Sequence, residues 1–245
     1  MGGQQSAADL TVIENVFRTQ WLRLRDWVGD LDEAARQRPS VLEGWTVAEV
    51  VAHLGRAMDA LAAAQPAEPG TVPLSLGEYV GQYPDRATQI ADVTRTLAAE
   101  IETDPLAAVD RTTEAAFAQL TQLRNLAPDP VVQARRGPIL LSEMVISRLV
   151  ELVVHGDDLA RSTGRTGPGF GSGPLDEAAV RLVAEALLEI AVDRGGWSLE
   201  VVDPLTWIRL ACGRVPYDVD VLAGAVQPVH TSDSVPDLGR MLPLL

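Results

Sequence analysis

The chain has 245 residues, of which 47% are hydrophobic and only 4% aromatic, so its interior must consist mainly of Ala, Val and Leu. This composition favours packed helices over a β-sandwich, and the length suits one large domain or two modest ones. The formal net charge is −14, and all 20 basic residues are Arg. Such a charge repels phosphate backbones and anionic lipid, so we expect neither a nucleic-acid partner nor a membrane partner.

The sequence also predicts a cytoplasmic location. The N-terminus lacks the basic segment and the apolar core of a signal peptide, and the single Cys212 cannot form an internal disulfide. Charged residues interrupt every apolar stretch before the ~18 residues that a membrane span needs.

Two amphipathic helices are predicted in the first part of the chain. Across residues 8–28 the apolar residues recur at helical spacing, with charged residues between them. Thr46 and Glu49 stand in the S/T-x-x-E relation of a capping box, so a second helix should begin there. The predicted core stripe of that helix consists of Val47, Val50, Val51, Leu54, Met58 and Leu61. Residues 65–70, which contain two prolines and a glycine, predict a surface loop.

Three more helical patterns lead to a predicted domain boundary. They cover residues 85–102, 105–126 and 138–162, and prolines at 128 and 130 stop the second. Residues 164–174 then contain five glycines and two prolines, which no helix or strand interior tolerates. We therefore predict a helical-bundle domain over residues 1–165 and a second domain over residues 174–245.

The second domain is predicted to be a small α+β unit. Residues 175–194 and 204–212 have helical patterns, whereas residues 197–202 and 217–222 alternate as strands do. The predicted fold class is thus mainly α, with a bundle followed by a small α+β C-terminal domain.

The helix predicted over residues 138–162 carries an unusual polar face. At about 100° per residue, one side of it holds Arg148, Glu151, His155 and Asp158, while its middle is otherwise apolar. Glu151 and His155 are four residues apart, which lets both side chains reach one ion, as in the H-E-x-x-H motif of zinc enzymes. His53, at the edge of the apolar stripe of an earlier helix, is a candidate third ligand. Two histidines and one glutamate leave a fourth coordination position open, as in catalytic zinc sites.

A structural interpretation accounts for the same residues. Arg148 can pair with Glu151 at i,i+3, His155 can bond a nearby carboxylate, and His53 can be a satisfied residue at the edge of the core. Asp157 and Asp158 favour the metal site, because carboxylates commonly orient metal-bound imidazoles, but both can equally be solvated. Spacing alone leaves both interpretations open.

Three other residues are weaker candidates. His230 lies in a predicted loop and is expected to be exposed and without a function. Cys212 has no His or Lys near it in sequence, so a buried structural thiol is favoured over a nucleophile. Arg214 follows Gly213, where a helix should end, and can bind an anionic ligand or simply interact with the helix dipole. The Gly-rich linker has no phosphate-binding motif, which argues against a nucleotide loop.

Two segments resemble the signatures of a known family. Residues 43–54, EGWTVAEVVAHL, resemble the Gly-Trp-Thr-Val…His-Leu signature of the maleylpyruvate isomerase N-terminal domain. Residues 151–160, ELVVHGDDLA, resemble its second signature, Glu-x-x-x-His followed by Asp-Leu-Ala. The resemblance covers roughly residues 8–165. It implies a DinB-like four-helix bundle in which His53, Glu151 and His155 hold a divalent metal, usually taken as zinc, and it implies the thiol mycothiol as cofactor, as in many actinobacterial enzymes of the family.

The C-terminal part resembles a different group. Residues 203–214 and 237–245 look like the tail of an actinobacterial subgroup labelled sterol-carrier-like, although this chain is shortened there. By resemblance to a Gly-Arg pair of that tail, Arg214 is implied to bind the substrate or the thiol cofactor as a catalytic residue.

Two functions follow as hypotheses. The first is a metal-dependent enzyme that activates a thiol cofactor for isomerisation of, or thiol transfer to, an electrophilic small molecule. The alternative is a non-enzymatic sterol-carrier-like module that binds a lipid or a protein partner and has a structural or vestigial metal site. The sequence indicates neither the substrate nor the oligomeric state.

Overall fold

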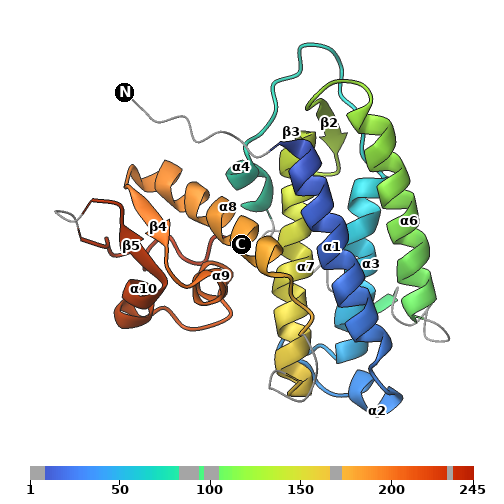
Figure 1. Cartoon of the computed structure of the whole chain (residues 1–245), viewed down its shortest axis with the longest axis horizontal. Helices are drawn as coiled ribbons and strands as arrows, with labels where there is room; N and C mark the ends of the chain where they lie inside the picture. The colour runs from blue at the N-terminus through green and yellow to red at the C-terminus, as the bar shows by residue number, and fades with distance from the viewer. Residues whose placement is uncertain (1–8, 83–93, 97–104, 166–172, 231–233) are drawn as a thin grey trace.

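The computed structural model describes residues 9–82, 94–96, 105–165, 173–230 and 234–245. The fold is mainly helical, with a four-helix bundle followed by a smaller α+β unit, as predicted (Figure 1). The bundle helices are α1 (Leu10–Gly29), α3 (Val47–Ala62), α6 (Pro105–Arg124) and α7 (Leu141–Thr163). None of the described helices is both long enough and apolar enough to span a bilayer.

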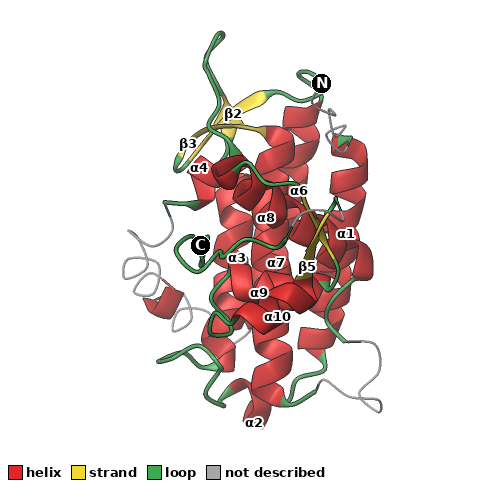
Figure 2. Cartoon of the chain, turned by 90° about the vertical axis from the view of Figure 1, so that its left-hand side faces the viewer, coloured by secondary structure: helices red, strands yellow, loops and turns green. Residues whose placement is uncertain are grey.

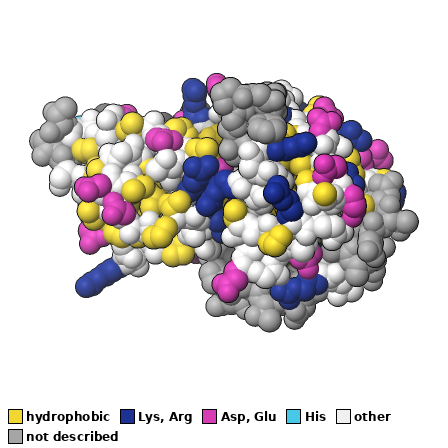
Figure 3. Space-filling model, turned by 90° about the horizontal axis from the view of Figure 1, so that it is seen from below, with side chains coloured by type: hydrophobic (Ala, Val, Ile, Leu, Met, Phe, Trp, Pro, Cys, Tyr) yellow, Lys and Arg dark blue, Asp and Glu magenta, His cyan; other side chains and the backbone are white. Residues whose placement is uncertain are grey.

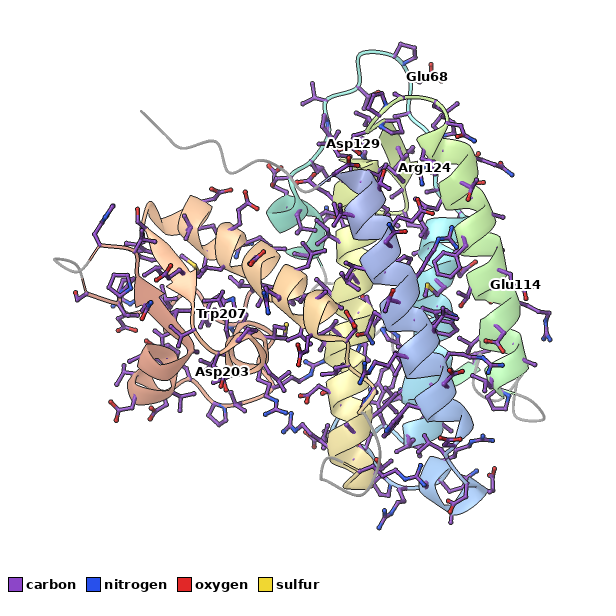
Figure 4. All side chains as sticks on the ribbon, in the orientation of Figure 1. Glu68, Glu114, Arg124, Asp129, Asp203 and Trp207 are labelled. Carbon is purple, nitrogen blue, oxygen red and sulfur yellow. The ribbon has the colours of Figure 1, made fainter. Side chains whose placement is uncertain are left out.

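The predicted apolar stripes form the interior of the bundle. In α1, Ile13, Phe17 and Leu24 are at most 1% exposed. In α3 the whole predicted stripe is buried, and the capping box of Thr46 and Glu49 is present as predicted. Leu140, at the start of α7, makes no side-chain cap. Asp129 supplies one instead, accepting hydrogen bonds from the Ser142 backbone at 2.9 Å and the Ser142 hydroxyl at 2.7 Å (Figure 4).

Short elements connect the bundle helices. They are α2 (Glu33–Arg36), β1 (Gln65–Pro66), α4 (Leu76–Val80), β2 (Val131–Ala134) and β3 (Gly137–Leu140). The three strands form an antiparallel sheet in the order β1-β2-β3. Helix α7 begins at Leu141 rather than at the predicted residue 138, because residues 137–140 pair with β2. The helix predicted over residues 85–102 lies largely outside the described residues.

The C-terminal unit combines helices with a two-stranded antiparallel sheet. Its elements are α8 (Glu177–Gly195), β4 (Leu199–Val201), α9 (Pro204–Ala211), α10 (Val219–Ala225) and β5 (Val226–Pro228). The strand predicted over residues 217–222 is wrong. Asp218 caps a helix there, since its carboxylate accepts hydrogen bonds from the backbone of Asp220 and Val221, and β5 pairs with β4 instead. Trp207 fills the space between α8 and α9, fully buried, and its indole donates to the carbonyl of Ala184 at 3.0 Å (Figure 4).

The C-terminal unit lies against the bundle helices. Figure 2 shows α8, α9 and α10 in front of the bundle, and α8 packs on α7 and α1. Gln20 of α1 is fully buried and binds the chain just before α8, donating to the Pro174 carbonyl at 2.9 Å and accepting from the Asp176 amide at 2.8 Å. One continuous hydrophobic core runs through both parts. The division into separate domains at residues 165 and 174 therefore stays a prediction.

Candidate metal centre

Two neighbouring bundle helices bring together the three side chains proposed from the sequence. His53 comes from α3, and Glu151 and His155 come from α7. Each offers one ligand atom, and these atoms all lie within 4.8 Å of one another. Nε2 of His53 is 3.3 Å from Oε2 of Glu151, and Nε2 of His155 is 3.4 Å from the same oxygen. The structure thus places the trio in one cluster.

Local structure sets the position of each member of the trio. The capping box at Thr46 determines where α3 begins, and His53 lies almost two turns into that helix. Glu151 and His155 are one turn apart in the middle of α7, which is buried on nearly every side. The three side chains remain 10–11% exposed, so the cluster lies at the edge of the interior.

The other nitrogen of each imidazole also has a partner. Nδ1 of His155 is 3.0 Å from Oδ2 of the fully buried Asp158, and Nδ1 of His53 is 3.3 Å from the hydroxyl of Thr94. An ionised carboxylate only accepts hydrogen bonds, so Nδ1 of His155 is the donor and its Nε2 is left to face Glu151. The ring of Trp45 meets the ring of His53 edge-on, with centroids 5.7 Å apart.

Burial and charge act against each other on these groups. Burial raises the pKa of Glu151, but hydrogen bonds from His155 and His53 and the charge of Arg148 outweigh it and hold that pKa well below its usual value. Burial lowers the pKa of His53, and its hydrogen bond to Glu151 offsets this only in part. Burial also lowers the pKa of His155, but hydrogen bonds to Asp158 and Glu151 reverse the effect, so this pKa is raised. Glu151 is therefore an anion in this cluster.

Two arginines approach Glu151. Arg148 is 2% exposed, and its Nη1 lies 4.0 Å from Oε1 of Glu151, the i,i+3 pair that the structural interpretation proposed. Arg56 lies three residues after His53 on α3, and burial lowers its pKa, as do the charges of Arg135 and Arg136. Arg56 has no hydrogen bond or ion pair to any described residue.

The two aspartates after His155 have different partners. Asp158 contacts the imidazole of His155, as the sequence interpretation proposed for an orienting carboxylate, and it also accepts hydrogen bonds from Arg214. Asp157 contacts neither histidine and is paired with Arg209 of α9. Neither aspartate is solvated, since Asp157 is 4% exposed and Asp158 is 0% exposed.

The remaining candidates lie as follows. Cys212 is buried, and burial raises the pKa of its thiol to about 12, so the structural thiol predicted from the sequence is confirmed. His230 is exposed, as predicted. Arg214 does not contact the trio directly but is separated from His155 by Asp158 alone.

Sequence reasoning missed four residues around the cluster. Thr94, Arg56 and Arg209 are far in sequence from His53, Glu151 and Asp157, the groups with which they interact, and only the packing of the helices brings them together. Trp45 could have been identified from the sequence, because it lies inside the Gly-Trp-Thr segment that carried the resemblance.

The comparison with protein families agrees with the two signature segments. Residues 17–160 match the family model described as the mycothiol maleylpyruvate isomerase N-terminal domain. A solved structure titled "Crystal structure of the mycothiol-dependent maleylpyruvate isomerase" is similar at 18% identity and a TM-score of 0.45, covering 93% of this chain and 95% of that chain. Among curated proteins no sequence matches. Since the family model spans more than half of the sequence, the chain belongs to the mycothiol maleylpyruvate isomerase N-terminal domain family.

Proposed function

We propose that this protein is a metal-dependent enzyme of the mycothiol-dependent maleylpyruvate isomerase type. His53, Glu151 and His155 hold a divalent metal, zinc in this proposal, and mycothiol is the thiol cofactor. The substrate is an electrophilic small molecule such as an unsaturated keto acid, which is isomerised or receives the thiol. The observation that carries the proposal is the convergence of the three ligand atoms in one cluster.

The donor set fits a zinc ion. Tetrahedral zinc ligands at bond lengths of about 2.0–2.1 Å lie about 3.3–3.4 Å from one another. Oε2 of Glu151 is 3.3 and 3.4 Å from the two Nε2 atoms, and all three ligand atoms lie within 4.8 Å of one another. With Nδ1 of His155 donating to Asp158, Nε2 is the nitrogen directed at Oε2 of Glu151, and a cation between these two atoms would take the place of the Nε2 proton.

The charges of the surrounding residues support binding of anions beside the metal. Arg148 faces Glu151 and Arg214 faces Asp158, so two cations already match the two buried carboxylates. A divalent ion adds positive charge that an anionic sulfur and a substrate carboxylate would balance. Arg56, one turn beyond His53 and without a hydrogen bond or ion pair to a described residue, is the residue we assign to the substrate carboxylate.

The nucleophilic sulfur must come from a bound thiol. A divalent metal lowers the pKa of a coordinating thiol and so supplies a sulfur nucleophile at neutral pH. Cys212, the chain's own thiol, is buried with a pKa of about 12 and stays protonated. Arg214 binds Asp158 and the Cys212 carbonyl through Nε and Nη1, and its Nη2 has no hydrogen bond to a described residue. That edge of the guanidinium is available to the thiol cofactor or the substrate.

Metal analysis combined with single variants tests the proposal. Protein purified without chelators is expected to contain about one zinc per chain, which Glu151→Ala and the double variant His53→Ala/His155→Ala lose. His230→Ala is the matched control, since that histidine is exposed and lies in the C-terminal unit. Parent and control should isomerise maleylpyruvate only when mycothiol is present. Zinc retained by the double variant would refute the ligand assignment, and zinc-loaded protein that is inactive with mycothiol would refute the activity.

The lipid-binding alternative gains no support from the described residues. Its argument needs an apolar tunnel in the C-terminal unit, whereas the described residues show the fully buried Trp207 of α9 packed and hydrogen-bonded against α8.

A further inference from the structure

Two adjacent aspartates of α7 each bind one arginine of the C-terminal unit. Asp157 accepts from Nε and Nη2 of Arg209, on α9, at 2.8 and 2.6 Å. Asp158 accepts from Nε of Arg214, just after α9, at 3.1 Å to each carboxylate oxygen. Figure 3 shows arginine side chains gathered along the border between the C-terminal unit, at the left, and the bundle. The two pairs therefore hold the same two parts of the molecule together.

The two pairs differ in what their aspartate touches. Oδ2 of Asp158 is also the partner of Nδ1 of His155, at 3.0 Å. Asp157 has no hydrogen bond to the trio, and its other ion pair is to Arg161 at 3.9 Å. A continuous chain of hydrogen bonds thus runs from Arg214 through Asp158 to His155, and no such chain starts at Arg209.

Arg214 is itself held in a defined position. Its Nη1 donates to the Cys212 carbonyl at 2.9 Å, and its backbone amide donates to the Arg209 carbonyl at 2.7 Å. Gly213, with φ of +65°, makes the tight turn that brings the arginine back toward α7. Asp158 is fully buried, and among the described residues Arg214 is the arginine that donates hydrogen bonds to it, so without Arg214 this carboxylate would be held by the contact with His155 and lose the donor that fixes its other side.

We propose that Arg214 is a positioning residue of the metal centre, which orients the imidazole of His155 through Asp158. The C-terminal unit then takes part in metal binding although all three ligands belong to the bundle. This inference rests on the proposed function for the identity of the ligands. In this role Arg214 orients His155 before substrate or thiol binds.

The test compares Arg214→Gln with Arg209→Gln, without substrate or thiol. Both variants remove one charged contact between α7 and the C-terminal unit, but only Arg214→Gln interrupts the chain to His155. We expect the zinc Kd of Arg214→Gln, measured by chelator competition, to rise on the order of tenfold. The visible spectrum of its Co²⁺-substituted form should shift. Arg209→Gln should keep the Kd and the spectrum of the parent.

Two further measurements keep the inference testable. Arg214→Lys keeps the charge and should fall between the parent and Arg214→Gln in zinc Kd, which also covers the case in which the Gln variant does not fold. In the metal-free protein, the Nδ1 proton of His155 should give a low-field NMR signal that is displaced in Arg214→Gln and unchanged in Arg209→Gln.

The outcomes separate this inference from the proposed function. An unchanged zinc Kd and Co²⁺ spectrum in Arg214→Gln would overturn the positioning role. Arg214 would then keep only the proposed contact with substrate or thiol. Equal weakening in both variants would also overturn it, because general loosening of the C-terminal unit would explain the result. A parent that binds no zinc would instead refute the proposed function, while the NMR signal would still decide whether Arg214 orients His155.

Discussion

Single side chains near the trio differ mainly in whether their charge has a partner. Arg148 and Arg214 each face a buried carboxylate. Arg56 lies one turn from His53, and its pKa is lowered by burial and by Arg135 and Arg136. Arg56 feels the charges of Asp59 and Glu151 but has no hydrogen bond or ion pair to a described residue, so its guanidinium donors are available to an anion.

Arg56→Gln is therefore expected to raise KM for a carboxylate substrate. A lost hydrogen bond between charged groups costs about 1.5–3 kcal/mol, so KM should increase about tenfold or more while the zinc Kd stays constant. Arg181→Gln is the control, because Arg181 is exposed on α8. Steady-state kinetics of both variants decide the point, and an unchanged KM in Arg56→Gln would remove Arg56 from the site.

Asp203 provides a pH-dependent contribution to stability. Burial is the largest single influence on Asp203 and raises its pKa, but the hydrogen bonds from the Thr206 hydroxyl and amide and the charge of Arg209 together outweigh it, so the pKa lies below its usual value (Figure 4). A carboxyl with a depressed folded-state pKa stabilises the fold above its unfolded pKa of 3.8, and this contribution is lost as the pH falls through the folded value.

Asp203→Ala should accordingly lower the free energy of unfolding at pH 7 by about 1 kcal/mol, the usual cost of losing a helix N-cap. Urea unfolding at several pH values would show this difference shrinking as the pH falls below 3.8 and lost once the pH is below the folded-state pKa of Asp203. A difference that stayed constant down to the lowest pH would mean that the ionised carboxylate is not what stabilises α9.

At the scale of elements, α3 and α7 determine the geometry of the candidate centre. Helix α7 receives its N-terminal cap from Asp129, outside the helix, whereas α3 begins at its own capping box. In that box the Thr46 amide donates to Oε2 of Glu49 at 2.6 Å, and the Glu49 amide donates to the Thr46 hydroxyl at 3.2 Å. Fraying of this first turn would move His53 relative to Glu151.

Thr46→Ala should lower the free energy of unfolding by about 1 kcal/mol and also weaken zinc binding. Ser75→Ala is a matched control, because Ser75 and Glu78 form the same capping box on α4, which carries no member of the trio. Chemical unfolding together with zinc titration of both variants makes the comparison. Equal zinc Kd values in the two variants would show that the start of α3 does not control the position of His53.

At the scale of the whole molecule, the candidate centre is not what holds the fold together. The bundle interior consists of fully buried apolar side chains such as Phe17, Leu54, Leu120 and Leu149, which need no metal to pack. The charged cluster lies at the edge of this core, between helices that also carry long apolar stripes.

Removal of the metal with a chelator should therefore lower Tm without abolishing the fold. Zinc at 1,000 times its Kd stabilises the native state by about 4 kcal/mol, and removing it should leave the far-UV circular dichroism nearly unchanged. Calorimetry and circular dichroism before and after chelation test this. A metal-free chain without helical signal would instead place the metal among the groups required for folding.

The sequence alone was enough for features that depend on residues a few positions apart. Helical periodicity, the capping box at Thr46, the Glu151/His155 spacing and the burial of Cys212 were all predicted from local patterns. His53 was proposed from its place at the edge of an apolar stripe, and a resemblance over two short segments implied the same trio. Only the tertiary structure decided the pairing of Asp157 with Arg209 and of Asp158 with Arg214, and the helical state of residues 219–225. Those outcomes depend on how helices pack and which strand is available to pair with β4. Such long-range contacts leave no periodic pattern in the chain.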